Sequence, residues 1–419
     1  MAMDMRIRVR NSECTPGSWK RRASRIARIL GLALPAALAG CQGYTFTEIA
    51  SGFDILPNAR AALAEDGTVV ASEASRFLVG DGSSLAPVDL SGLGLEVTAP
   101  SPRRRPVRVR TEGDIAFVAN YPAALGCMFG GRGAYRIATS GGPLTTYFEG
   151  CLGTSAGVVG TEMGLSANGT VAFSQITNGQ GAIYRGPVSG PVSVLRSGTG
   201  GFYNTQTLDV SDAGRVAVQM EYFDGFAGGL MRGLLIFDEP EQDKAVIDTA
   251  IEKLGIGTQP PLAINASGEV AFSLDADVSF PIGATVYNFP AGVYRATPTL
   301  FNTPKSLTLI ADLGGKYCGF GAVDINDAGD VVFEARVDGE TGCTSGTSFD
   351  GLFVGPDSEA DAVVVRGNSG LGAHQFFDDI QLGEMNDAGQ VSFTTTYSEP
   401  LVDPIKVWRA DKGSRARRR

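Results

Sequence analysis

The nine residues Ile325-Asn326-Asp327-Ala328-Gly329-Asp330-Val331-Val332-Phe333 decide the fold, because relatives of this stretch recur along the whole sequence. Locally they predict a β-hairpin corner. The Asn and Asp side chains can bond backbone groups two residues on, and the glycine supplies the positive φ that a short bulged loop needs. Val331 and Phe333 are two residues apart, so in a strand they point to the same face of the sheet.

Six further stretches share this pattern. They are residues 63–71 (LAEDGTVVA), 109–117 (VRTEGDIAF), 165–173 (LSANGTVAF), 210–218 (VSDAGRVAV), 264–272 (INASGEVAF) and 385–393 (MNDAGQVSF). The seven turn glycines are Gly67, Gly113, Gly169, Gly214, Gly268, Gly329 and Gly389, at spacings of 45 to 61 residues. This period suits one four-stranded propeller blade per repeat. The turns are too short for an EF-hand loop, so we expect plain turns and no metal site.

Each repeat contains four predicted strands, which we label A to D in chain order. A precedes the glycine turn, B follows it, C begins near a small residue, and D follows a further polar turn. The last repeat stops after its C strand at residues 406–409, whereas an extra strand at residues 44–50 precedes the first repeat. We therefore predict an all-β protein. It is a seven-bladed β-propeller of four-stranded antiparallel blades, closed when residues 44–50 complete the last blade.

Residues 1–40 have the pattern of an export signal. A basic region that includes Arg21-Arg22 precedes the apolar stretch 29–40, and Leu38-Ala39-Gly40-Cys41 follows. This resembles the lipobox of bacterial lipoproteins, in which the cysteine is acylated and becomes the first residue of the mature protein. We predict lipidation of Cys41 and an exported lipoprotein that is anchored in a bacterial membrane and faces the periplasm or the cell surface. An ordinary signal peptide is the alternative, and Arg21-Arg22 leaves twin-arginine export open.

The expected mature chain is acidic. Residues 1–40 hold eight of the 35 basic and two of the 45 acidic residues, which leaves 27 basic and 43 acidic residues and a net charge of −16. This charge argues against nucleic-acid binding. Two basic runs remain, residues 103–110 (RRRPVRVR) and 415–419 (RARRR), and we expect a solvated loop and a solvated tail.

Four of the six cysteines remain once Cys14 and Cys41 are set aside. They are Cys127, Cys151, Cys318 and Cys343. Export permits disulfides, and close spacing favours the pairs 127–151 and 318–343 among the three possible connectivities. A zinc site is not expected, because there is no CxxC motif and only one histidine.

Taken together, the repeats resemble those of bacterial surface proteins with tandem NxxGxxAF repeats and a variable choice of membrane anchor. The resemblance covers nearly all of the mature chain, although Asn stands at the first motif position only at Asn265, Asn326 and Asn386. It implies a propeller-like architecture and a surface location, and it assigns no activity.

No catalytic motif emerges. A triad would need His374, whose surroundings (residues 370–377, GLGAHQFF) favour a structural role in a loop entering the last blade. Glycoside hydrolysis needs only two carboxylates, but no spacing selects a pair from the candidates Glu221, Asp224, Asp275, Asp277, Asp378, Asp379 and Glu384. Aromatic residues at blade spacing are expected to pack between blades rather than to line a carbohydrate groove. These are Tyr184, Tyr294 and Phe353.

We interpret residues 1–40 as a lipoprotein signal peptide, residues 41–410 as one propeller, and residues 411–419 as a basic disordered tail. The favoured function is a monomeric binding module on the cell envelope, without a cofactor, that takes a protein or polysaccharide partner. The alternatives are an exported carbohydrate-active enzyme (a glycoside hydrolase or lyase) on the same scaffold, and a purely structural envelope protein.

The connections between the predicted strands differ in uniformity. The A–B turns are alike, whereas the B–C segments vary widely in length. In a four-stranded blade the A–B and C–D turns share one face, here called the glycine-corner face. The B–C and D–A connections share the opposite face, here called the loop face. Variable loops on a rigid scaffold are where binding residues tend to lie, so the sequence predicts the ligand site on the loop face.

Overall fold

The computed structural model describes residues 43–56, 60–97, 105–123, 127, 130–151, 158–177, 180–197, 202–224, 229–239, 242–250, 262–274, 276–282, 285–297, 306–313, 316–337, 348–397 and 404–413. Strands dominate these ranges. Their only helical segments are two 3₁₀ turns, η2 (Ser91–Leu93) and η6 (Ser369–Phe376). None of the helical segments within these ranges has the length and apolar character needed to cross a bilayer.

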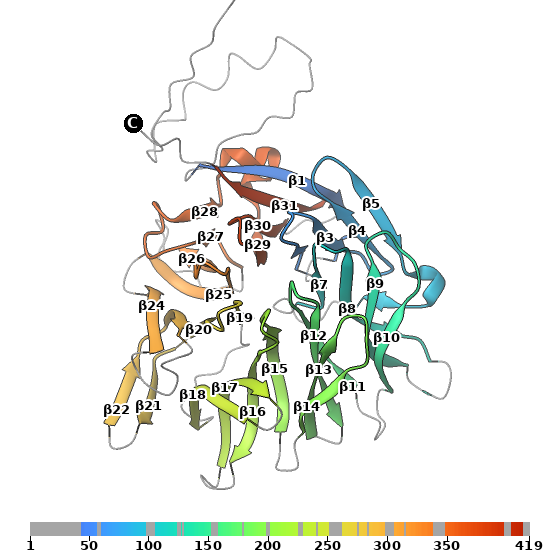
Figure 1. Ribbon diagram of the computed structural model, residues 1–419. Coiled ribbons are helices and arrows are strands. Elements are labelled where there is room, and N and C mark those ends of the chain that lie inside the picture. The colour runs from blue at the N-terminus through green and yellow to red at the C-terminus, as the bar shows by residue number, and fades with distance from the viewer. Residues whose placement is uncertain are drawn as a thin grey trace, which may run out of the picture.

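Seven antiparallel sheets of four strands form the blades of a ring (Figure 1). This confirms the predicted seven-bladed propeller. The first blade contains β2–β5 (Ala62–Leu63, Val69–Ser72, Arg76–Gly80, Leu85–Asp89), and the second contains β7–β10 (Val107–Val109, Asp114–Tyr121, Gly131–Ala138, Thr145–Cys151). The third contains β11–β14 (Val158–Leu165, Thr170–Thr177, Gln180–Pro187, Ser193–Ser197), and the fourth contains β15–β18 (Phe202–Val210, Val216–Asp224, Gly229–Glu239, Gln242–Ala250). The fifth contains β19, β20, β23 and β24 (Ala263–Ile264, Val270–Leu274, Gly292–Ala296, Leu307–Asp312), and the sixth contains β25–β28 (Tyr317–Ile325, Val331–Val337, Gly351–Phe353, Ala362–Val365).

The seventh blade is completed by the first strand of the fold. Its order is β1 (Tyr44–Gly52), β31 (Ile405–Lys412), β30 (Val391–Thr396) and β29 (Asp379–Met385). β31 runs to Lys412, two residues beyond the expected end of the propeller at residue 410. Two short additions decorate the ring: β6 (Glu96–Val97) pairs with β8, and the hairpin of β21 (Val278–Ile282) and β22 (Thr285–Phe289) is inserted between β20 and β23.

The seven glycine corners share one hydrogen-bond pattern. At the corner of the sixth blade the Asn326 N–H donates to Asp330 O, and the Gly329 N–H donates to Asn326 O. The same two backbone bonds occur at every other corner, and all seven turn glycines have positive φ, as at Gly329 (φ 80°). The Asn326 side chain accepts from the Asp330 N–H, four residues on, rather than two as the turn pattern predicted. This wider bond supports the loop that the glycine turns.

Each blade buries both of its faces. Val331 and Phe333 pack toward the fifth blade in a cluster with Ala263, whereas Val332 between them packs toward the seventh blade with Leu382. All three residues of this stretch are buried, so the polar alternation of a one-sided sheet is absent. The reason is that every blade stands between two neighbours, and this leaves no solvent-facing side for its central strands.

Aromatic pairs link the second and third strands of most blades. Phe173 lies opposite Tyr184 with ring centroids 5.2 Å apart, and Phe272 lies opposite Tyr294 at 5.8 Å. Phe353 is fully buried and pairs with Phe333 in the same way. These aromatic residues therefore pack in the blade cores, as expected, rather than lining a groove.

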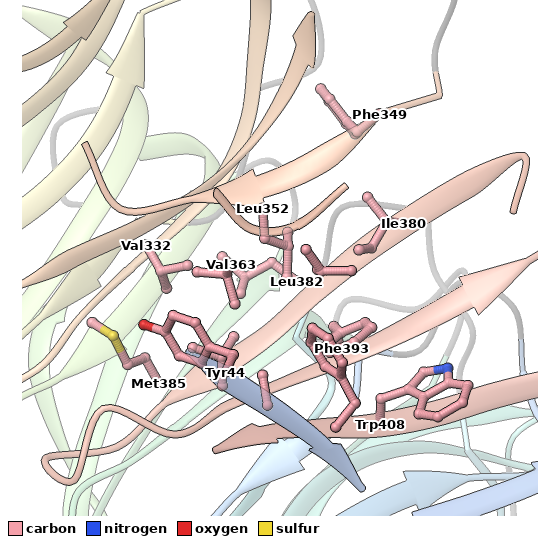
Figure 2. Packing of buried hydrophobic residues seen from close by; sticks show 14 of the residues in the cluster. Tyr44, Val332, Phe349, Leu352, Val363, Ile380, Leu382, Met385, Phe393 and Trp408 are labelled. Carbon is pink, nitrogen blue, oxygen red and sulfur yellow. The ribbon is translucent and has the colours of Figure 1, made fainter. Parts of the chain in front are cut away.

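β1 closes the ring from outside the last blade. It pairs antiparallel with β31, from Tyr44 opposite Lys412 to Gly52 opposite Ile405. Figure 2 shows Tyr44 among buried side chains of the sixth and seventh blades. Phe46 packs edge-on against Phe393, with the two ring centroids 6.1 Å apart. The prediction that residues 44–50 complete the seventh blade is confirmed.

Deleting residues 44–50 should lower the free energy of unfolding by several kcal/mol, because it exposes the edge of β31 and the apolar surface under Tyr44 and Phe46. Phe46→Ala, a milder change, should cost about 3 kcal/mol through the cavity it leaves. Chemical denaturation measures both. Phe53→Ser is the control, since the Phe53 side chain is 61% exposed and its loss should change stability little. Equal stability of the deletion variant and the intact chain would contradict this account.

Candidate functional site: the acidic mouth of the central channel

In each blade the strand before the glycine corner lies nearest the axis of the ring (Figure 1), and one position on this strand recurs at the channel. This position is five residues before the corner glycine. In four blades it holds a charged residue: Arg108, Asp209, Asp324 and Glu384. These residues line a cavity of about 120 Å³ at the glycine-corner end of the channel.

Arg108 connects four blades. Its guanidinium bonds Asp209 Oδ1 of the fourth blade at 2.7 Å and Glu384 of the seventh, and its Nε donates to Met163 O of the third at 3.1 Å. All three charged groups are buried. Burial alone would lower the pKa of Arg108, but Asp209 and Glu384 beside it raise that pKa above its ordinary value. Arg108 is therefore a permanent cation at the centre of the ring.

Each carboxylate around Arg108 also bonds the backbone of the next blade. Glu384 Oε2 accepts from the Leu63 N–H of the first blade at 2.6 Å, and Asp209 Oδ2 accepts from the Ile264 N–H of the fifth at 3.2 Å. Burial raises the pKa of both carboxyl groups, and Arg108 opposes that shift. These charges thus hold neighbouring inner strands in register.

Two further buried arginines extend the network. Arg105 bonds Asp324 Oδ1 at 3.1 Å, and Asp324 Oδ2 accepts from the backbone of Met385 in the next blade. Arg60 bonds Glu334 Oε1 at 2.6 Å, and Glu334 is fully buried. A buried charge is tolerated when it is paired and hydrogen-bonded. Both guanidinium groups are paired with a carboxylate through their terminal nitrogens, whereas their Nε atoms are buried without a hydrogen-bond partner.

The expectation of a solvated loop at residues 103–110 is wrong for two of its arginines. Arg105 is 2% exposed and Arg108 is 6% exposed. Arg108 belongs to β7, whose alternation turns it toward the axis, where the carboxylates of other blades compensate its charge. Arg103 and Arg104 lie outside the described residues. The basic tail at residues 415–419 also lies outside them.

A second ring of carboxylates stands above this network, two residues before the corner glycines. Glu65, Asp212, Asp327 and Asp387 occupy this position, and we call these four residues the acidic mouth. Four hydrogen bonds run between neighbouring blades. Asp387 N–H donates to Glu65 Oε2 at 2.9 Å, Asp327 N–H to Asp387 Oδ1 at 2.8 Å, and Ala266 N–H to Asp327 Oδ1 at 2.7 Å. The Asn168 N–H donates to Asp212 Oδ1 at 3.2 Å.

The carboxylates of the acidic mouth are partly buried and repel one another. Burial raises the pKa of Glu65 to about 7, and the negative charges of Asp387, Asp327 and Asp212 add to the shift. The pKa of Asp387 is raised for the same reasons. The Lys and Arg residues among the cavity lining are Arg108 and Arg110, and both are already paired, Arg110 with Asp114. The mouth therefore carries negative charge that no lining cation balances.

The described residues contain no group of three or more His, Cys, Asp or Glu side chains placed to hold a metal ion. The mouth carboxylates face the cavity from separate blades and bond backbone N–H groups. Such an arrangement forms a negatively charged recess that suits a positively charged group, and it does not place several ligand atoms around one metal position.

Among the candidate carboxylates whose side chains the structure describes, Glu384 alone lines the channel cavity. Asp378 pairs with Arg366 at 3.1 Å, Asp277 accepts from the Ala291 N–H, and Asp379, with a pKa raised to about 6 chiefly by burial, accepts from the Phe349 N–H. Glu221 and Asp224 belong to β16, and Asp275 lies outside the described residues.

His374 is buried in η6. Its Nδ1 is 3.4 Å from the Thr395 hydroxyl, which also accepts from the Trp408 indole N–H, and its ring lies 4.7 Å from that of Tyr397. This packing is the structural role expected from its position before the last blade.

Cys127 and Cys151 form a disulfide with a Cα–Cα distance of 5.3 Å, which confirms the first predicted pair. Cys318 is disulfide-bonded. Its expected partner, Cys343, lies outside the described residues, so the second pair stays a prediction. Cys41 and the predicted signal at residues 1–40 also lie outside them.

The cavity is on the glycine-corner face, whereas sequence analysis favoured the loop face for the ligand. A signal for the channel existed in the sequence. Three carboxylates and one arginine stand five residues before corner glycines, and four carboxylates stand two residues before them. Aligning the seven repeats on their glycines places these charges in rings, because equivalent positions of a propeller face the same axis.

Comparison with known proteins assigns no activity to this chain. The model of a family of unknown function, DUF7453, matches residues 261–414, less than half of the chain. No curated protein sequence gives a significant match.

Three solved structures match this chain at low sequence identity. A putative gluconolactonase is 11% identical, with 88% of this chain and 92% of that chain covered and a TM-score of 0.37. TolB from Acinetobacter baumannii is 13% identical, with coverage of 82% and 79% and a TM-score of 0.39. The calcium-binding protein regucalcin from Agrobacterium tumefaciens is 14% identical, with coverage of 69% and 86% and a TM-score of 0.35. None is similar enough for its activity to be transferred to this chain.

Arg108→Met should lower the free energy of unfolding by about 3–5 kcal/mol, because it leaves Asp209 and Glu384 buried without their cation. Urea denaturation of the variant and the parent chain measures the difference. Lys316→Met is the control, since it removes an exposed cation paired with Glu359 and should leave the unfolding midpoint unchanged. Equal effects of the two substitutions would show that Arg108 does not organise the channel.

Proposed function

We propose that this chain is a lipid-anchored binding module of the bacterial cell envelope, and that its acidic mouth receives a positively charged group of its partner. The observation that carries the proposal is the cavity on the axis, where four carboxylates face one recess and the lining arginines are already neutralised. Burial chiefly raises the pKa of Glu65, and the neighbouring carboxylates add to the shift, so a positively charged side chain or amine entering there would offset their repulsion.

The hydrogen bonds of the three carboxylates that line the channel below the acidic mouth support binding over catalysis. Asp209, Asp324 and Glu384 each bond both an arginine and a backbone N–H. A carboxylate committed in this way is poorly placed to exchange protons with a substrate, and a glycoside hydrolase would need two such groups free. The closed ring adds rigidity, which reduces the ordering that binding requires.

The anchoring part of the proposal rests on Leu38-Ala39-Gly40-Cys41 and the basic and apolar segment before it. Cys41→Ala should move the protein from the membrane fraction to the soluble fraction, because it removes the thiol that takes the lipid. Metabolic labelling with a fatty-acid analogue and fractionation of cells test this. Cys318→Ala is the control, since it changes a cysteine of the body and should retain both label and membrane association. An unlabelled parent protein would reject the anchor.

The charge of the mouth predicts pH-dependent binding of a cationic probe, fluorescein-labelled tetralysine. Because the pKa of Glu65 is about 7, raising the pH from 6 to 8 ionises this carboxyl group. Affinity should therefore rise with pH, by up to about tenfold if binding needs the ionised form. Glu65→Gln should flatten this dependence while it retains an acceptor for the Asp387 N–H. Fluorescence anisotropy at low ionic strength measures the affinity.

The matched test of position uses two double variants with the same change of charge. Asp327→Asn with Asp387→Asn removes two mouth carboxylates and should weaken tetralysine binding at least about tenfold, or 1.4 kcal/mol. Asp54→Asn with Asp378→Asn removes two carboxylates at the loop face and should leave binding nearly unchanged. Loss of binding only in the loop-face variant would overturn the assignment of the site and favour the loop face instead.

A further inference from the structure

We infer that the glycine-corner face is turned toward the bilayer and that the loop face is presented to the compartment. The inference rests on the proposed lipid anchor at Cys41, and the occupant of the glycine-corner face is the lipid surface itself. It follows from where the folded chain begins and how little chain separates that point from the anchor.

The fold begins on the glycine-corner face. Gly43 O accepts from the Gly413 N–H at 2.7 Å, just before Tyr44 pairs with Lys412. Lys412 lies beside the corner of the seventh blade, where its Cδ is 3.2 Å from the place that a Cβ atom added to Gly389 would occupy. Its Nζ is 3.6 Å from Asp330, next to the corner of the sixth blade. The start of β1 is thus at the level of the corners.

The rest of β1 keeps its beginning in place. Tyr44 is 3% exposed, and the Thr47 hydroxyl donates to Asp411 Oδ2 at 3.2 Å. Thr47 also lies against Gly82, in the turn between β4 and β5 on the same face. Releasing β1 from the sheet would lengthen the tether, meaning the chain between Cys41 and the folded body. It would also expose the buried side chains of Tyr44 and Phe46, so the loss of apolar burial opposes this release.

The tether is short compared with the thickness of the ring. Only two peptide links join Cys41 to Gly43, and they span at most about 8 Å. A blade strand such as β13 has eight residues and is therefore about 25 Å long. An acyl chain on Cys41 consequently enters the bilayer beside the glycine-corner face, and the far ends of the strands cannot reach the membrane through this anchor.

This arrangement gives the two faces different surroundings. The acidic mouth opens toward the headgroup layer, whereas the Cys127–Cys151 disulfide and the β21–β22 hairpin lie on the distal side. The attachment point, at the start of β1, lies at the edge of the ring.

Two single-cysteine labels report the orientation of the acylated full chain in phosphatidylcholine vesicles. Ser83→Cys places a dye in the exposed β4–β5 turn on the glycine-corner face, and Phe376→Cys places it on the loop face, where the Phe376 side chain is 62% exposed. Lipids carrying a nitroxide at the headgroup quench dyes near the surface. We expect the dye at residue 83 to be quenched at least twofold more than the dye at residue 376. Equal quenching, or stronger quenching at residue 376, would overturn the orientation.

A second arm separates this inference from the proposed anchor. If the parent chain does not float with vesicles, the anchor proposal fails, and the orientation is tested by attaching a lipid to the α-amino group of a Gln42→Gly chain that starts at residue 42. Preferential quenching at residue 83 in this lipidated chain supports the geometry of the tether. Its absence rejects the geometry even when Cys41 is acylated.

Discussion

The constraint on which the whole structure depends is that every blade has two apolar faces. Val332 faces the seventh blade, while Val331 and Phe333 on either side of it face the fifth. A sheet of this kind cannot end at water on either side without exposing its core. The ring therefore has to close, and the seven repeats have to pack in sequence until the last meets the first.

Closure uses the two ends of the fold in one sheet. β1 supplies the outer strand that the seventh repeat lacks, and its Tyr44 and Phe46 enter the same core as Phe393 and Trp408 (Figure 2). The contact joins residues more than 350 positions apart. Because β1 holds this seam, the position of its first residue, Tyr44, is fixed relative to both faces of the ring.

Closure also creates the channel and determines its chemistry. Inner strands brought together around the axis place charged residues of distant blades in contact, and Arg108 gathers Asp209 and Glu384 across separations of 101 and 276 residues. Buried ion pairs are weak contributors to net stability, because desolvation offsets most of their attraction. Their value here lies in specificity: each carboxylate bonds one particular backbone N–H of the next blade, which favours one register of inner strands. The carboxylates at the mouth lack such cations among the lining residues, and this difference is the basis for our proposal that this end of the channel receives a positive group.

The sequence by itself determined the number of blades, the glycine corners, the closing strand and the pairing of Cys127 with Cys151. These features depend on local patterns, such as Asn-Asp-Ala-Gly before Val-Val-Phe, that repeat along the chain and have the same physical cause each time. Aligned on their glycines, the repeats also place the channel and mouth charges in rings. The tertiary structure alone decided that Arg105 and Arg108 are buried, that Arg108 pairs with Asp209 and Glu384, and that the cavity opens on the glycine-corner face. Those outcomes depend on which residues meet at the axis after the ring closes, and the repeat pattern does not specify such partners.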